Sequence, residues 1–230
     1  MTKKFAVFVE GQTEQEFTIK LLRELAGKQG IEFEVRFQFA GKLSFSELRS
    51  SHQNPVIQVL VVDCRNDGQV KSQIIEQYNS LVTSGYSLVI GLRDVYPFTH
   101  NDIAKLEKNL LIGLPSGGLP IHLHLAIMEI EAWFLEEKSH FSRIDQRITG
   151  DEIIANGFDF NNMRACELPH PAATLDTIYK SVGKWYDKDT RRIRRTVEAL
   201  SYEELYINTR QKAPSLEKFI NSLEEGLFSS

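Results

Sequence analysis

The chain has 230 residues and carries 31 acidic against 27 basic side chains, a formal net charge of −4. This length allows one large domain, or a medium domain with a smaller one attached, and it buries a core without disulfides or metals. A slightly acidic protein has no general attraction for polyanions, so any contact with nucleic acid must use a local basic patch.

The two cysteines, Cys64 and Cys166, lie far apart and form no CxxC pair. Their spacing argues against a structural zinc site or a disulfide framework and favours a reduced, cytoplasmic setting. The N-terminus runs directly into an apolar strand pattern, without the features of a signal peptide, and no segment has the roughly 20 apolar residues that cross a bilayer. The sequence therefore predicts a cytoplasmic protein with no membrane contact.

Strand and helix patterns alternate over the first part of the chain. Strands are predicted at 5–9, 31–39, 56–63, 87–94 and 121–128, and helices at 13–27, 69–83 and 100–111. Strict alternation of apolar and polar residues at 31–39 predicts a half-buried strand toward a sheet edge. A turn is predicted at Asn66-Asp67-Gly68. The α/β order predicts a Rossmannoid parallel or mixed sheet flanked by helices.

The chain changes character near residue 141, after which it has no strong strand pattern. Helices are predicted there near 151–156, 172–182, 189–200 and 214–224. We therefore expect an α/β domain over residues 1–140 and a helical C-terminal region over residues 141–230 that packs on it.

Carboxylates follow three of the predicted strands: Glu10 the first, Asp94 the strand at 87–94, and Glu129 with Glu131 the last. The carboxyl ends of parallel strands meet at one sheet edge, where ligands bind in open α/β folds. Converging carboxylates repel one another unless a cation lies among them, and oxygen ligands without a His or Cys set favour Mg²⁺ or Mn²⁺. Such a site suits phosphodiester chemistry.

Each acid taken alone is explained by a solvated strand end or a helix cap, whereas the set as a whole favours a metal site. The roles of Glu129 and Glu131 stay open. If the strand continues through both, they lie on the same side; if a helix begins there, residues two apart point in different directions.

Three segments resemble the successive motifs of a known family: Val9-Glu10-Gly11-Gln12-Thr13-Glu14, Leu92-Arg93-Asp94-Val95-Tyr96-Pro97 and Glu129-Ile130-Glu131-Ala132-Trp133-Phe134-Leu135. They are similar to the TOPRIM-like proteins grouped as the DUF4276 family, which is related to the TOPRIM domains of OLD-type nucleases. Residues 171–175, 186–188 and 215–220 resemble the C-terminal tail of that family. The resemblance covers most of the chain.

This resemblance implies a TOPRIM-like fold and magnesium-dependent cleavage of phosphodiester bonds by a nuclease, with a role in bacterial defence or mobile elements. It implies that Glu10 positions a metal or acts as general base, and that Asp94 binds Mg²⁺ as the first acid of a DxD-type motif. Tyr96 stands in place of the second acid. Either Glu129 or Glu131 completes the site, or the protein is a non-catalytic subunit that binds nucleic acid or protein. An enzyme acting on nucleotide phosphates also stays open.

The strongest basic patch comprises Lys188, Arg191, Arg192 and Arg195, with Trp185 and Tyr186 next to it. It can follow a nucleic-acid backbone while the aromatic rings stack on bases. The alternative is a solvated helix face paired with nearby acids.

Lys71, just inside an earlier helix, can reach a phosphate, although an ordinary exposed lysine explains it better. His122 and His124 share one strand face, and without a third ligand they are predicted to be hydrogen-bonded rather than metal-bound. A protein partner or a second copy of the chain stays open.

Overall fold

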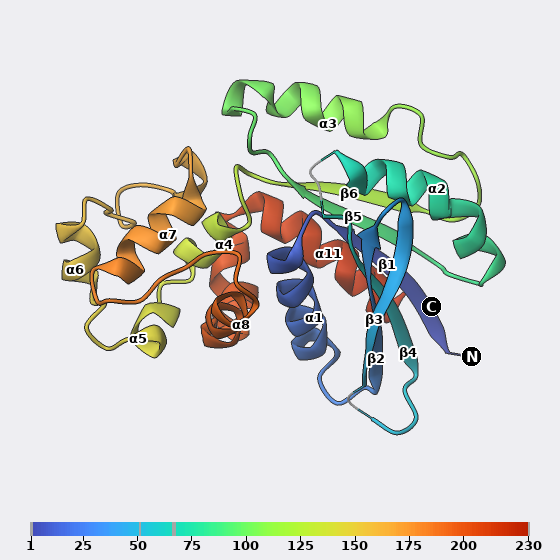
Figure 1. Cartoon of the computed structure of the whole chain (residues 1–230), viewed down its shortest axis with the longest axis horizontal. Helices are drawn as coiled ribbons and strands as arrows, with labels where there is room; N and C mark the ends of the chain where they lie inside the picture. The colour runs from blue at the N-terminus through green and yellow to red at the C-terminus, as the bar shows by residue number, and fades with distance from the viewer. Residues whose placement is uncertain (1, 51, 66–67, 230) are drawn as a thin grey trace. The chain divides into compact units, whose positions relative to one another are not determined.

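The structure is a computed structural model that describes residues 2–50, 52–65 and 68–229. Its described strands form one sheet in the order β3-β2-β4-β1-β5-β6 (Figure 1). The strands are β1 (Lys3–Val9), β2 (Ile31–Phe39), β3 (Lys42–Ser50), β4 (Ile57–Asp63), β5 (Val89–Asp94) and β6 (Ile121–Ala126).

Helices surround the sheet and make up the later chain. The first group is α1 (Gln12–Ala26), α2 (Gln69–Thr83), η1 (His100–Asp102) and α3 (Ile103–Leu111). The second group is α4 (Glu131–Glu136), α5 (His140–Ile144), α6 (Gly150–Ala155), η2 (Ala165–Glu167), α7 (Pro171–Lys180), α8 (Thr190–Ala199), α9 (Tyr202–Glu204), η3 (Leu205–Thr209), α10 (Arg210–Lys212) and α11 (Pro214–Phe228).

The sheet is mixed and mostly parallel. β1 lies between β4 and β5 and is parallel to both, and β2 is parallel to β4. The hydrogen bonds from Val89 N to Pro120 O and from Val95 N to Ala126 O advance together, so β6 is parallel to β5. Among the strands of the described residues, only β3 is antiparallel. The predicted α/β class, with a Rossmann-like sheet flanked by helices and a helical C-terminal region, is confirmed.

Each predicted strand and helix is present, with shifts at the ends: β6 stops at Ala126, two residues before the predicted strand does. The sequence did not predict β3, whose side chains are mostly exposed and lack a clear apolar alternation. β3 forms because it pairs with β2 along its length and because Arg49 makes a bidentate ion pair with Glu16 of α1, at 2.8 and 2.9 Å. The turn predicted at Asn66-Asp67 lies outside the described residues.

The described chain divides into two compact units, each made of more than one segment. The first comprises Met1–Arg93, Ala104–Leu125 and Lys218–Ser230, and the second comprises Asp94–Ile103 and Ala126–Glu217. The first unit therefore contains most of the sheet with α1, α2 and most of α11, and the second contains α4 to α10.

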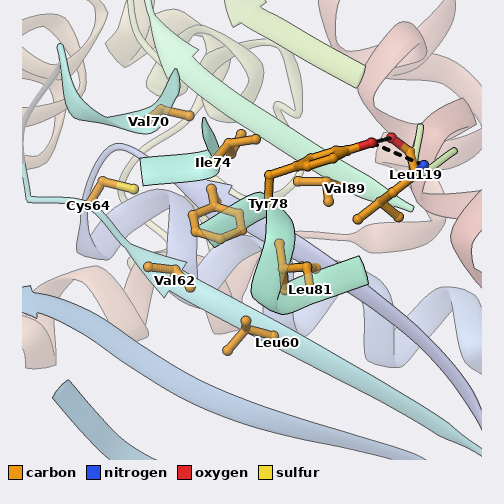
Figure 2. Close-up of a cluster of buried hydrophobic side chains, with 11 residues drawn as sticks. Leu60, Val62, Cys64, Val70, Ile74, Tyr78, Leu81, Val89 and Leu119 are labelled. Carbon is orange, nitrogen blue, oxygen red and sulfur yellow. Dashed lines mark hydrogen bonds between the residues drawn. The ribbon is translucent and has the colours of Figure 1, made fainter. Parts of the chain in front are cut away.

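In the first unit, α2 covers one face of the sheet. A buried apolar cluster joins α2 to residues of β1, β4 and β5, as Figure 2 shows. At its rim, Tyr78 Oη donates to Leu119 O and accepts from Leu119 N, both at 3.2 Å. Gly117 packs so closely that a Cβ there would lie 2.3 Å from Tyr78 Oη. The glycine thus allows the loop before β6 to close over the cluster.

Helices α1 and α11 lie against the other face of the same sheet. Gln15 of α1 donates from Nε2 to Arg36 O at 2.9 Å and to Val61 O at 3.2 Å. Gly226 of α11 rests on the ring of Phe5, where a Cβ would lie 2.9 Å from the ring edge. Helices on both faces bury most of the central strands β1 and β4, which explains why these two strands are continuous apolar runs.

The second unit has its own core, in which α4 packs on α7 and α5 packs on α8. Aromatic side chains fill it; Phe141 and Tyr179 meet edge to face with ring centroids 6.3 Å apart. Glu137 of the same unit is fully buried. Its carboxylate accepts hydrogen bonds from Ser201 N at 3.0 Å and from Arg143 Nη2 at 3.3 Å. This carboxylate joins the end of α4 to the segment after α8.

The contribution of His140 to the free energy of unfolding is expected to fall by about 3 kcal/mol as the pH is lowered from about 6.5 to about 4, and His124, whose pKa is also lowered to about 4, adds to the fall. His140 is completely buried, and burial lowers its pKa to about 4. Between these pH values the unfolded chain binds a proton at His140 and the native state does not. The contribution of neutral His140 to the free energy of unfolding is therefore complete above this window and lost below it. Urea unfolding at a series of pH values measures the effect.

The control variants separate His140 from its neighbours. Burial raises the pKa of Glu137, which acts with the opposite sign, so the test compares slopes between variants. A His140→Asn protein should show a shallower dependence on pH, and a His52→Asn protein, changed at an exposed residue, should keep the wild-type slope. Equal slopes in all three proteins would contradict the assignment.

Among the described residues, no helix combines the length and apolar character that crossing a bilayer requires.

Candidate functional site

Three hydrogen bonds within the second unit join the loop after β6 to the end of β5. Val95 N donates to Ala126 O at 3.0 Å, Tyr96 N to Met128 O at 2.8 Å, and Ile130 N to Asp94 Oδ1 at 3.0 Å. Met128 adopts a left-handed backbone, with φ of 61°, which turns the chain out of the strand direction. Asp94 thus accepts a hydrogen bond from the backbone of the residue that lies between Glu129 and Glu131.

Glu131 begins α4, so the helical alternative for this pair is the correct one. Glu129 and Glu131 point to different partners. Glu131 is buried, and its Oε1 accepts a hydrogen bond from Tyr186 Oη at 2.6 Å. Tyr186 is itself held by its backbone N–H, which donates to Asp176 Oδ1 at 2.9 Å. The tyrosine therefore fixes the direction of the Glu131 carboxylate.

Glu129, in the loop after β6, is half-buried. Its Oε2 accepts a hydrogen bond at 2.8 Å from Ala172 N, in the first turn of α7. Burial raises the pKa of this carboxyl, while the Ala172 N–H, His170 and Lys188 each act to lower it. The ring of His170 meets Tyr96 edge to face, with centroids 5.2 Å apart. The second unit therefore gathers carboxylates, an imidazole and an ammonium group around the loop after β6.

Glu10 belongs to the first unit, where it directly follows β1 and is partly exposed. Burial raises the pKa of the Cys64 thiol, and the negative charges of Asp63 and Glu10, at the ends of β4 and β1, raise it further. Asp63 Oδ1 accepts from Arg65 N at 2.8 Å. A Cβ on Gly11 would lie 3.1 Å from Glu14 Oε2, so the glycine lets this second carboxylate approach the backbone.

The donor set is oxygen-rich, as magnesium prefers, but it is not a closed cage. Within residues 2–50, 52–65 and 68–229, no three His, Cys, Asp or Glu side chains are arranged to hold a metal ion. Magnesium commonly binds through one or two carboxylates, keeps several waters and completes its coordination with substrate phosphate. The described carboxylates form no closed metal cage, which leaves the open mode as the one to test.

The predicted basic patch is only partly exposed on α8. Arg192 forms an ion pair with Asp187, and Arg195 donates to Trp185 O while its guanidinium lies 5.6 Å from the centre of the Tyr179 ring. Arg191 and Lys188 are exposed. Asp189 caps the helix by accepting from the first backbone N–H groups. Two of the four predicted side chains thus point to protein partners, and two remain accessible.

Lys71 is half-buried and donates from Nζ to Asn109 O at 2.6 Å in the first unit. His122 Nδ1 and His124 Nε2 both hydrogen-bond Ser222 Oγ, at 3.1 and 2.9 Å, as predicted for a pair without a third ligand. Burial, with His122 and Lys218 nearby, lowers the pKa of His124 to about 4.

His170 has no role predicted from the sequence, and Tyr186 is predicted only to stack on bases. The signal for His170 was present: Pro171 follows it, and proline at the first helical position marks His170 as the N-cap of α7. No local signal pointed to Tyr186, because its partner lies 55 residues away in the chain.

No protein-family model matches this chain, and neither does any curated protein or any solved structure.

Proposed function

We propose that this protein is a TOPRIM-like, Mg²⁺- or Mn²⁺-dependent phosphodiesterase that cleaves nucleic acid. One observation supports the proposal: Asp94 Oδ1 accepts from Ile130 N, the residue between Glu129 and Glu131, and Lys188 acts to lower the pKa of Glu129. Carboxylates beside an ammonium group are what an enzyme needs to hold a divalent cation and a phosphate together. The family-like motifs of the sequence support the same reaction.

The residues of the second unit have distinct roles in this proposal. Asp94 and Glu129 would hold the cation through their carboxylate oxygens, and Glu131, oriented by Tyr186, is the further candidate ligand. Bound there, the cation would neutralise charge on the phosphate and lower the pKa of a water molecule. Lys188 would bind a phosphate oxygen, and the exposed Arg191 would follow the nucleic-acid backbone.

Glu10 keeps the role that the sequence resemblance implies, as a metal ligand or as the general base that takes a proton from water onto a carboxylate oxygen. It directly follows β1, which is the parallel neighbour of β5 in the sheet. Its contribution is tested by its own variant, Glu10→Gln.

A second candidate function is a non-catalytic subunit that binds nucleic acid or protein. The observation that favours it is that Asp94, Glu129 and Glu131 each accept a hydrogen bond from the protein, from Ile130 N, Ala172 N and Tyr186 Oη. In such a protein these carboxylates would serve to join the loop after β6 to α7 and to Tyr186. Tyr96, in place of an acid, supports the same candidate.

A cation titration followed by thermal unfolding tests the proposal. Mg²⁺ and Mn²⁺ should raise the unfolding temperature of the wild-type protein, because a cation that binds only the folded state stabilises it by mass action. The shift should disappear in Asp94→Asn. It should persist in Glu136→Gln, a matched control in the same unit whose carboxylate also accepts a backbone hydrogen bond, from Ala165 N at 2.7 Å.

The titration is repeated with a short oligonucleotide that is not cleaved, because a magnesium site can require phosphate to complete it. A wild-type protein that gives no cation-dependent shift with or without the oligonucleotide would overturn the proposal and leave the binding subunit as the better assignment.

A further inference from the structure

Strand β3 lies at the edge of the sheet. Its neighbour on one side is β2, and no described strand lies on its other side. The outer side of such a strand presents backbone N–H and C=O groups that can pair with another chain. We propose that β3 pairs antiparallel with β3 of a second copy of this chain, so that two sheets continue into one another. The inference is independent of the proposed catalytic function.

A β-bulge shapes the exposed surface of β3. Opposite β2, Glu34 faces Leu48 and Arg36 faces Phe45, with one extra residue on β3 between them. Because Glu34 and Arg36 are two apart and share a face, Phe45 and Leu48 also share that face, although they are three apart.

Phe45 and Leu48 are 55% and 58% exposed. Natural edge strands usually carry charges or prolines that discourage pairing. Here two large apolar side chains lie together on the sheet face opposite the Arg49–Glu16 ion pair, which holds the other face to α1. Exposed apolar residues gathered on an edge strand mark a surface that another strand covers.

The charges of β3 select a second copy as that strand. Within one copy, Arg49 already pairs with Glu47 at 2.6 Å as well as with Glu16 at 2.8 Å. In an antiparallel pair with a two-fold axis at Leu48, each Leu48 lies opposite its copy, and the Glu47–Arg49 pair of one copy lies opposite Arg49 and Glu47 of the other. Opposite charges in directly facing positions favour a pair of strands.

Moving the axis by one residue to Glu47 would place two carboxylates opposite each other, which is unfavourable. In the register centred on Leu48, the two Leu48 side chains meet on one face, and Glu47 and Arg49, of opposite charge, face each other on the other face. Self-complementarity of this kind is what a two-fold interface requires.

Sedimentation equilibrium over a wide range of protein concentration measures the association. The wild-type protein should form a dimer, and Leu48→Lys should raise the dissociation constant by at least about tenfold, because it places two ammonium groups opposite each other on the axis. Phe39→Lys is the matched control: Phe39 is 61% exposed at the end of β2, outside the paired segment, and its variant should dimerise as the wild type does.

Disulfide formation tests the register. In a Cys166→Ser background, which leaves only the buried native Cys64, Leu48→Cys should cross-link rapidly on mild oxidation. Facing Cα atoms in antiparallel strands are about 4.5–5.5 Å apart, within the range of a disulfide. Phe45→Cys should not cross-link, because the two copies of residue 45 would be roughly 20 Å apart along the paired strands.

Positions 39, 45 and 48 are exposed and Cys166 is partly buried, and circular dichroism melts check that each variant folds. A wild-type protein that is monomeric at every concentration would overturn the proposal. So would a dimer in which Phe45→Cys cross-links as fast as Leu48→Cys, since the copies would then be joined through another surface or another register.

Discussion

Replacing Asp94 and Glu129 by their amides is expected to slow Mg²⁺-dependent cleavage of nucleic acid by at least about 100-fold. The Asp94→Asn/Glu129→Gln double variant keeps the shape of both side chains and an oxygen that can accept from Ile130 N and Ala172 N. It removes two negative charges from the place where we propose that the cation binds. The loss should therefore appear in the chemical step rather than in the folding of the loop.

The measurement pairs single-turnover cleavage of labelled DNA and RNA with equilibrium binding of the same strands in calcium, which supports binding better than cleavage. Cleavage should fall and binding should stay within about twofold of the wild type, because Lys188 and Arg191, which make phosphate contacts in the proposal, are unchanged. Glu136→Gln should cleave normally.

Each other outcome assigns the protein differently. If the double variant cleaves as fast as the wild type, Asp94 and Glu129 are not ligands of a catalytic cation. If the wild type binds nucleic acid but cleaves neither DNA nor RNA with Mg²⁺ or Mn²⁺, the protein is a binding subunit. If it hydrolyses small nucleotides and ignores nucleic acid, the reaction is right and the substrate class is wrong.

Replacing Trp133 by alanine is expected to reduce the free energy of unfolding by about 3–5 kcal/mol. Trp133 is 1% exposed, near the start of α4, and its Nε1 donates to Ser215 Oγ at 3.0 Å. The change removes the largest fully buried side chain and leaves a cavity that the surrounding helices can fill only in part. Urea unfolding followed by circular dichroism measures the loss.

Trp185→Ala is the matched control, because that indole is 50% exposed and its loss should cost about 0.5 kcal/mol or less. Trp133→Phe separates packing from hydrogen bonding: it keeps an aromatic ring and loses the bond to Ser215, so it should cost less than the alanine variant. Equal losses in Trp133→Ala and Trp185→Ala would contradict the place of Trp133 in the core.

The elements of this protein could be predicted because their signals are local. Buried strands such as 56–63 show as apolar runs, and helices such as 13–27 show a repeat of apolar residues every three to four positions. β3 escaped prediction because most of its side chains are exposed, and its stability comes from the ladder with β2 and from the pair between Arg49 and Glu16. No sequence pattern within residues 42–50 indicates that these residues pair with β2 or with Glu16.

The candidate site divides in the same way. The sequence by itself determined the α/β class and the placing of acids after strands, because burial on both sheet faces requires apolar strands and leaves carboxylates at their ends. Only the tertiary structure decided that Glu129 meets Ala172 of α7 and that Glu131 meets Tyr186, 43 and 55 residues along the chain. Such pairs depend on how helices pack, and side-chain periodicity carries no information about contacts between distant segments.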